Sequence, residues 1–161
     1  MPQSFSEGLE FSIGLEEVRR NVEDLKDKVD IIILLSHMGL PLDVKLVSMV
    51  DGIDIVLSGH SHDRVIEAIV INETHVVQAG SSASFLGRLD MTINENKISD
   101  VQYELIHVDE KFEEDAEVKT IVDSILELHT AERNTIVGET KSILHRMTLE
   151  EAPMDKLITD A

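Results

Sequence analysis

The chain has 161 residues and a formal net charge of −18 at pH 7, and so acidic a surface argues against binding nucleic acid through its phosphates. It contains no cysteine, which excludes disulfide bonds and thiolate zinc sites. No apolar run approaches the length of a membrane span, and no signal-peptide core follows Met1, so composition leaves the compartment of the protein open.

The first two predicted elements are a helix and a buried strand. Apolar residues between positions 15 and 29 recur at alternating spacings of three and four, which predicts one amphipathic helix: Leu15, Val18, Val22, Leu25 and Val29. The helix leads into the β-branched run Ile31–Leu35, which predicts a buried strand. This run ends in the segment Ser36-His37-Met38-Gly39.

A second run of the same kind, Ile53–Ser58, predicts another buried strand, and it ends in Gly59-His60-Ser61-His62. Between the two runs, residues 43–50 predict a short helix whose inward face carries Leu46, Val47 and Val50. A strand, a helix and a strand in this order favour a parallel β-α-β crossover. The two histidine-bearing strands are therefore expected to be neighbours.

The remaining elements predict antiparallel strands and then helices. Residues 65–71 and 74–78 flank Asn72-Glu73 and predict a hairpin, as do residues 89–93 and 98–106 around positions 94–96. Residues 113–133 predict one long helix with an acidic start, which suits the helix dipole. Residues 135–140 predict a strand, and 153–161 predict a helix with Pro153 in its first turn. Parallel and antiparallel pairing together predict an α/β fold with a mixed sheet.

Three histidines follow the two parallel strands, where an open α/β sheet collects its functional groups. Imidazole is a favoured ligand for divalent metal ions, so His37, His60 and His62 predict a metal site. On an extended backbone His60 and His62 would have Cα atoms roughly 6.5–7 Å apart. That separation favours one histidine on each of two ions about 3.5–4 Å apart. His37 could complete the shell of either ion, and Gly59 would let the backbone approach closely.

Four blocks of the sequence resemble a known family in their order and spacing: residues 30–39, 52–62, 76–81 and 86–90. They are similar to the second half of the catalytic domain of the bacterial 5′-nucleotidases and 2′,3′-cyclic-nucleotide phosphodiesterases, within the calcineurin-like metallophosphoesterases. The resemblance implies an α/β domain, a mixed β-sheet sandwich flanked by helices. It also implies two divalent metal ions (Zn, Mn, Fe, Co or similar) that hydrolyse a nucleotide substrate. By position, His37 and His60 resemble ligands of one metal and His62 a ligand of the other.

The resemblance divides the chain into three parts: residues 1–112 from the catalytic domain, 113–135 as a linker helix, and 136–161 as the beginning of a carboxyl-terminal domain. The family's Asp-x-His, bridging Asp and Asn-His blocks are not found before Asp30, so the chain is expected to be a fragment carrying half a site. Alone it is expected to be inactive and to bind metal weakly or not at all. The alternative is a non-catalytic, truncated or split-gene fragment that assembles with a partner segment.

The remaining predictions concern residues outside the three-histidine set. His75, His107, His129 and His145 lack ligand spacing and are expected to have no catalytic role. The strand at 31–35 is expected to present an unpaired edge through which the chain self-associates. Catalytic and substrate-binding residues are left unassigned, as is the choice among nucleoside monophosphate, cyclic nucleotide and nucleotide-sugar substrates.

Overall fold

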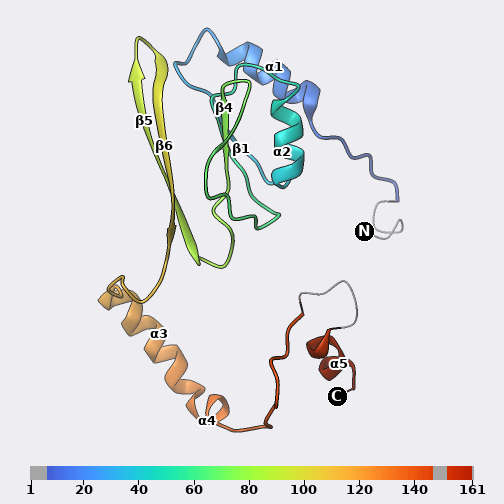
Figure 1. Ribbon diagram of the computed structural model, residues 1–161, viewed down its shortest axis with the longest axis vertical. Coiled ribbons are helices and arrows are strands. Elements are labelled where there is room, and N and C mark those ends of the chain that lie inside the picture. The colour runs from blue at the N-terminus through green and yellow to red at the C-terminus, as the bar shows by residue number, and fades with distance from the viewer. Residues whose placement is uncertain (1–6, 147–151, 161) are drawn as a thin grey trace. The chain divides into compact units, whose positions relative to one another are not determined.

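In the computed structural model, which describes residues 7–146 and 152–160, the first part of the chain is organised around a four-stranded sheet (Figure 1). The strands lie in the order β1-β2-β4-β3, with bounds Ile33–Leu35, Ile55–Leu57, Thr74–Val77 and Ile69–Ile71 respectively. The pairs β1–β2 and β2–β4 are parallel, whereas β3–β4 is antiparallel. The predicted α/β class with a mixed sheet is thereby confirmed.

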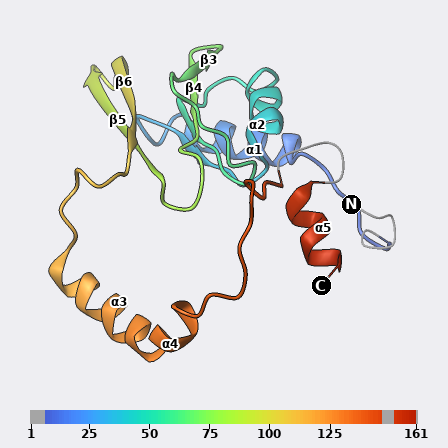
Figure 2. The same cartoon turned by 60° about the horizontal axis from the view of Figure 1, so that its bottom comes forward.

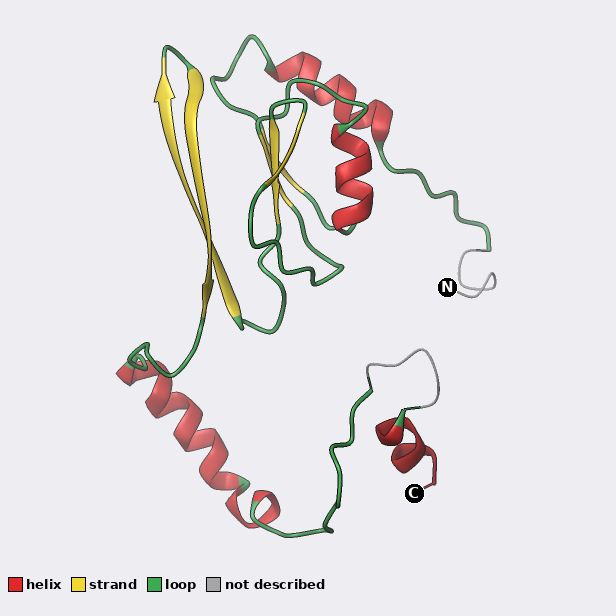
Figure 3. Cartoon of the chain, in the orientation of Figure 1, coloured by secondary structure: helices red, strands yellow, loops and turns green. Residues whose placement is uncertain are grey.

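Two helices, α1 (Leu15–Leu25) and α2 (Leu40–Val47), cover one face of this sheet (Figure 3). The parallel register aligns Leu34, Val56 and Val76 across β1, β2 and β4, and all three take part in the core. From α2 and the residues after it, Leu46, Val47 and Val50 are buried against them, as their helical spacing predicts.

The two helices differ slightly from their predicted bounds. Helix α2 begins at Leu40 rather than at residue 43, because Pro41 occupies its first turn, where a missing backbone N–H is tolerated. Helix α1 ends at Leu25, and Val29 lies beyond it with 42% of its surface exposed. The predicted amphipathic helix is thus confirmed over its first three turns only.

Both predicted hairpins are present. The turn between β3 and β4 places Asn72 and Glu73 at φ 48° and 67°, the left-handed pair that a two-residue hairpin loop requires. Strands β5 (Phe85–Asn94) and β6 (Lys97–His107) form a separate antiparallel sheet and are longer than the sequence predicts. Figure 1 shows this hairpin as a long two-stranded ribbon, and Figure 2 shows the same two strands from another direction.

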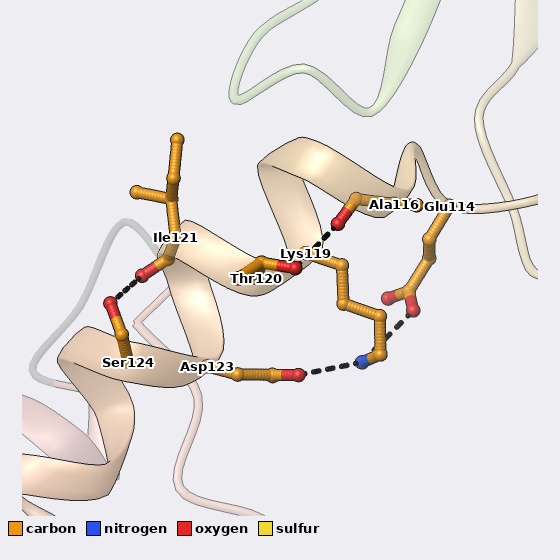
Figure 4. A network of polar contacts seen from close by, with 7 residues as sticks. All are labelled: Glu114, Ala116, Lys119, Thr120, Ile121, Asp123 and Ser124. Atoms are coloured by element: carbon orange, nitrogen blue, oxygen red, sulfur yellow. Dashed lines mark hydrogen bonds and ion pairs between the residues drawn. The ribbon is translucent and has the colours of Figure 1, made fainter.

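The chain divides into two units, Met1–Phe112 and Glu113–Ala161. Within the second unit the helix expected over residues 113–133 is interrupted at His129, whose φ of −110° and ψ of 12° are not helical. It therefore forms two helices, α3 (Ala116–Leu128) and α4 (Thr130–Arg133). On α3, the Lys119 Nζ atom lies 3.2 Å from Glu114 Oε2 and 3.4 Å from Asp123 Oδ2, and these carboxylates raise the pKa of Lys119. Figure 4 shows both ion pairs.

The strand predicted for residues 135–140 is wrong. These residues belong to no helix or strand, and Ile136 and Val137 are 84% and 98% exposed. A β-branched run does not form a strand without a neighbour to pair with. The last predicted helix is confirmed as α5 (Pro153–Asp160), with Ala161 outside the described residues. No helix in the described part of the chain has the length and apolar character needed to cross a bilayer.

Candidate metal centre

His37 and His60 come together beyond the ends of two neighbouring parallel strands. Pairing of β1 with β2 ends at Leu35 and Leu57, and the Ser36 N–H donates to the Leu57 carbonyl at 3.0 Å. His37 follows at once, and His60 lies three residues beyond β2. The two imidazole rings meet edge to face, with centroids 5.0 Å apart and planes at 69°. The expected juxtaposition of these two histidines is therefore present.

The separation of the two rings suits a shared metal ion. The Nδ1 atom of His60 lies 3.3 Å from the Nε2 atom of His37. Two imidazole nitrogens bound tetrahedrally at about 2.0–2.1 Å lie about 3.3–3.4 Å apart. Both side chains are exposed to solvent, so an ion can reach them. The pair therefore fits two ligands of one ion with two coordination positions left over.

His62 does not join this pair. Its side chain is exposed, and among the described residues no hydrogen bond or ring contact links it to His37 or His60. The extended backbone expected for residues 60–62 is wrong, since φ is 76° at His60 and 60° at His62. The Ser61 N–H instead donates to the Gly59 carbonyl at 3.0 Å, which closes a tight bend. The strand-like spacing of roughly 6.5–7 Å therefore does not apply here.

Gly59 allows His37 to pack against the second strand end. A Cβ atom at position 59 would lie 3.2 Å from His37 Nδ1 and 3.3 Å from the Ser36 carbonyl oxygen. Both separations are tighter than ordinary van der Waals contact. The predicted close approach of the backbone at Gly59 is thus confirmed, and its partner is the His37 ring.

A buried carboxylate supports the two histidine-bearing segments, and sequence reasoning missed it. Asp43 on α2 is completely buried. Its Oδ1 atom accepts a hydrogen bond from Ser36 Oγ at 2.5 Å, and its Oδ2 atom accepts one from Ser58 Oγ at 2.6 Å. The signal was present in the helical pattern, because an Asp at position 43 shares the apolar face of Leu46 and Val47. A charged residue on such a face is rarely buried without partners.

A buried amide holds the bend that carries the other two histidines. Gln78, just beyond β4, is 3% exposed. Its Nε2 group donates to the Gly59 carbonyl and to Ser58 Oγ, both at 2.9 Å. Its Oε1 atom accepts a hydrogen bond from the Asp63 N–H. Gln78 therefore hydrogen-bonds the backbone at Gly59 and at Asp63, on either side of His60 and His62.

Among the described residues, the donor set around the histidine pair is incomplete for two ions. Within residues 7–146 and 152–160 there is no group of three or more His, Cys, Asp or Glu side chains placed to hold a metal ion. The four other histidines lie on β4, at the end of β6, at the junction of α3 with α4, and in the segment before residue 147: His75, His107, His129 and His145. In the part of the chain that the structure describes, they form no such group with the His37–His60 pair. The structure thus offers a two-histidine arrangement that fits a single ion.

Comparison with known proteins places this chain among phosphoesterase-like sequences, although no family model matches it. It is 31% identical, over 81% of its length, to the trifunctional nucleotide phosphoesterase protein YfkN of Bacillus subtilis. Among solved structures it resembles the sulfate thiohydrolase SoxB of Thermus thermophilus, with a TM-score of 0.68 and 28% identity over 81% of the chain. A 5′-nucleotidase precursor, also from Thermus thermophilus, shares its fold, with a TM-score of 0.74 and 23% identity over 91% of the chain.

These similarities cover small parts of the other proteins. The chain spans 9% of the Bacillus protein, and 24% and 34% of the two Thermus chains. The likeness to the 5′-nucleotidase precursor, at 23% identity, concerns the fold alone. The sequence likeness to the Bacillus protein includes most of this chain, so it extends beyond the histidine-bearing strands.

Proposed function

This chain belongs to the 5′-nucleotidase family of the calcineurin-like metallophosphoesterases, and on that premise we propose that the whole protein hydrolyses phosphate esters of nucleotides. A nucleoside monophosphate or a 2′,3′-cyclic nucleotide is the proposed substrate. The name of the Bacillus relative, a nucleotide phosphoesterase, supports this substrate class. A net charge of −18 repels a phosphate ester at long range, so a local positive charge is needed where the ester binds.

The His37–His60 pair is the proposed source of ligands for one divalent ion. The observation that carries this proposal is the 3.3 Å separation of His60 Nδ1 from His37 Nε2, which matches two ligands of one ion. His62, on the same bend, is the proposed ligand of a second ion. Divalent ions held there would supply the positive charge that activates water and stabilises a phosphate ester under attack. The identity of the metal, among Zn, Mn, Fe and Co, is left to experiment.

We further propose that the chain by itself binds one ion weakly and does not hydrolyse phosphate esters. Two dications about 3.5–4 Å apart repel each other strongly unless carboxylates bridge and surround them. The described residues hold no group of three potential ligands, which supports this proposal. The same observation favours the second candidate, a non-catalytic fragment that assembles with a partner segment.

Calorimetric titration of the full 161-residue chain with zinc and with manganese tests both proposals. We expect one weak zinc site, which His37→Ala or His60→Ala should weaken by at least ~10-fold, because each removes a direct ligand. His62→Ala should have a smaller effect. His129→Ala, which removes an exposed histidine 3.2 Å from Glu132 in the second unit, serves as the matched control and should leave binding unchanged.

Turnover of adenosine monophosphate and of a chromogenic phosphodiester separates the two candidates. The chain alone should remain at background, whereas the whole protein should hydrolyse a nucleotide and lose that activity on His60→Ala. Stoichiometric binding of two ions by the chain alone would show that ligands were overlooked within it. Normal activity of the His60→Ala whole protein would refute the ligand assignment.

The free edge of β1 is the proposed surface for self-association. Among the described strands β1 has a neighbour on one side only, and Ile33 and Leu35 are 49% and 81% exposed. An edge strand with exposed apolar side chains is a template for pairing with a second copy. Sedimentation of the chain over a range of concentrations should show a dimer that Leu35→Lys abolishes. A monomer at all concentrations would contradict this proposal, and Val137→Lys, on a residue 98% exposed in the second unit, is the control.

A further inference from the structure

Two nearly inaccessible polar side chains lie beneath the histidine-bearing bends, and neither belongs to the proposed ligand set. Asp43 is fully buried and Gln78 is 3% exposed. Burying a carboxylate or an amide is unfavourable unless every polar atom finds a partner. In the described part of the chain no buried side-chain nitrogen or oxygen lacks one. The partners of Asp43 and Gln78 therefore show what these residues hold in place.

Asp43 fastens the ends of the two parallel strands to helix α2. It accepts hydrogen bonds from Ser36, which directly precedes His37, and from Ser58, two residues before His60. The Ser36 Oγ atom also accepts a hydrogen bond from the Met38 N–H at 3.3 Å. The turn that carries His37 is thus held from within by a hydroxyl that Asp43 orients.

Gln78 continues the same network on the other side of the bend. Ser58 Oγ donates to Asp43 and accepts from Gln78 Nε2, so the two buried residues are joined through one hydroxyl. Beyond it, Ser61 Oγ lies 3.3 Å from Gln78 Oε1 and accepts a hydrogen bond from the Leu40 N–H at 2.9 Å. A single chain of hydrogen bonds therefore connects α2, both strand ends and the bend.

The bend needs such support because its backbone is unfavourable by itself. His60 and His62 both adopt left-handed φ values, 76° and 60°, that a side chain with a Cβ atom disfavours. Residues in such conformations persist where the surrounding structure over-determines them, and they concentrate at functional sites. Here the surrounding structure is the Gln78 amide, which bonds the backbone at Gly59 and at Asp63 on either side of the two histidines.

We propose that Asp43 and Gln78 are positioning residues that fix the separation of the His37 and His60 rings and thereby set the metal affinity of the site. The effect on metal affinity rests on the proposed function, whereas the effect on the bend does not. Both residues act through others, since Asp43 touches the serines that precede the histidines and Gln78 touches the backbone around them.

The first measurement is amide hydrogen exchange, followed residue by residue in the full chain. Gln78→Met keeps the length of the side chain and removes both polar atoms, so the Asp63 amide should exchange at least ~10-fold faster once its acceptor is gone. The matched control is Thr74→Val, which removes a fully buried hydrogen bond at the other end of β4, from Thr74 Oγ1 to the Ile53 carbonyl. Thr74→Val should leave exchange at Asp63 and Leu40 unchanged.

The second measurement is zinc titration of the same proteins. Gln78→Met should weaken zinc binding by ~10–100-fold, the usual consequence of losing an outer-shell partner, and Thr74→Val should not. Asp43→Asn, which keeps the shape and one acceptor oxygen, should fall between the unmodified chain and Asp43→Ala. An intermediate zinc affinity in Asp43→Asn distinguishes a positioning role from general destabilisation. If Asp43→Ala fails to fold, the zinc affinity of Gln78→Met tests the proposal instead.

Two outcomes would overturn the inference. One is unchanged exchange at Asp63 in Gln78→Met, and the other is zinc binding by Gln78→Met equal to that of Thr74→Val. If the unmodified chain binds no zinc, the proposed function fails in this chain, while the exchange measurement still decides whether Gln78 holds the bend. The two failures are therefore distinguishable.

Discussion

Tyr103 is the single tyrosine of a chain without tryptophan, and it marks where the β5–β6 hairpin meets the first sheet. It lies on β6, and its hydroxyl donates to the Gln78 carbonyl at 3.5 Å. Burial raises the pKa of Tyr103, because the charged phenolate is disfavoured away from water. The folded state thus holds the phenol proton more tightly than the unfolded chain does.

The consequence for stability follows from the direction of that shift. The stabilisation is complete below the unfolded pKa of about 10 and is lost as the pH rises through the higher folded value. We predict that the free energy of unfolding falls above about pH 10 in the unmodified chain more steeply than in Tyr103→Phe. Ultraviolet titration of the single phenol in folded and in urea-unfolded protein checks the pKa directly. Equal midpoints in the two states would rule the shift out.

Sequence reasoning at the level of single residues found the ligand candidates but not their supports. His37 and His60 were predictable because each follows an apolar run that ends in a small polar segment. Asp43 and Gln78 were not recognised, because acidic and amide residues are mostly exposed. The place of Asp43 on the apolar face of its helix was a signal that went unused, and nothing local marks Gln78 as buried. His62 was assigned an extended backbone because local pattern does not reveal the hydrogen bonds that bend it.

Helix α3 shows how one side chain can fix the start of an element. Asp115 precedes the helix, and its Oδ1 atom accepts hydrogen bonds from the N–H groups of Glu117 and Val118, both at 3.0 Å. These are two of the N–H groups that a helix leaves without an internal partner. The carboxylate also lies at the positive end of the helix dipole. Asp115 should therefore account for a measurable part of the stability of α3.

We predict that Asp115→Ala destabilises α3 by about 1 kcal/mol, the usual loss on removing such a cap. Exchange of the Glu117 and Val118 amides should accelerate, and helical circular dichroism should decrease. Asp115→Ser retains an acceptor oxygen and should preserve most of the protection. Identical exchange in Asp115→Ala and the unmodified chain would show that packing, not the cap, determines where the helix starts.

At the level of elements, the apolar pattern of the sequence predicted a helix or strand correctly wherever that element packs against another part of the chain. The β3–β4 hairpin, α1, α2 and the parallel strands were predictable because their apolar residues bury one another. Residues 135–140 were not, since a β-branched run has the same local appearance with or without a neighbouring strand. The interruption at His129 was equally hidden, because His129 itself continues the spacing of the apolar residues that precede it, Ile125 and Leu126 among them.

The charge of the whole molecule is the dominant long-range electrostatic feature. A net charge of −18 makes the compact state repel itself, and the ion pairs that the structure describes lie largely at the surface, where each contributes little. Salt shortens the range of this repulsion, from about 10 Å at 0.1 M to about 3 Å at 1 M. Screening should therefore favour the folded state.

We predict that urea unfolding of the first unit, followed by Tyr103 fluorescence, requires more urea at about 0.3 M than at about 0.02 M sodium chloride. Urea is uncharged, so the denaturant does not change the ionic strength. The expected sign follows from the repulsion among the carboxylates. A midpoint that falls on adding salt would show that the surface ion pairs outweigh that repulsion.

The fold of the first unit was predictable because the order of strands, helices and turns leaves few topologies once the β-α-β crossover is parallel. The long hairpin was underestimated mainly in β5, since Gly87 and Arg88 separate Phe85 and Leu86 from the apolar residues that begin at Leu89.

The left-handed backbone at His60 and His62 has a consequence for selection. Glycine adopts this conformation freely, whereas a residue with a Cβ atom loses about 1–2 kcal/mol there. His60→Gly would relieve that strain and remove a proposed metal ligand in the same step, and His62→Gly would do likewise at the second position. A library of variants screened only for thermal resistance would therefore enrich glycine at these two sites and discard the proposed chemistry. Selection for function would retain histidine at both positions, whereas selection for stability alone would not.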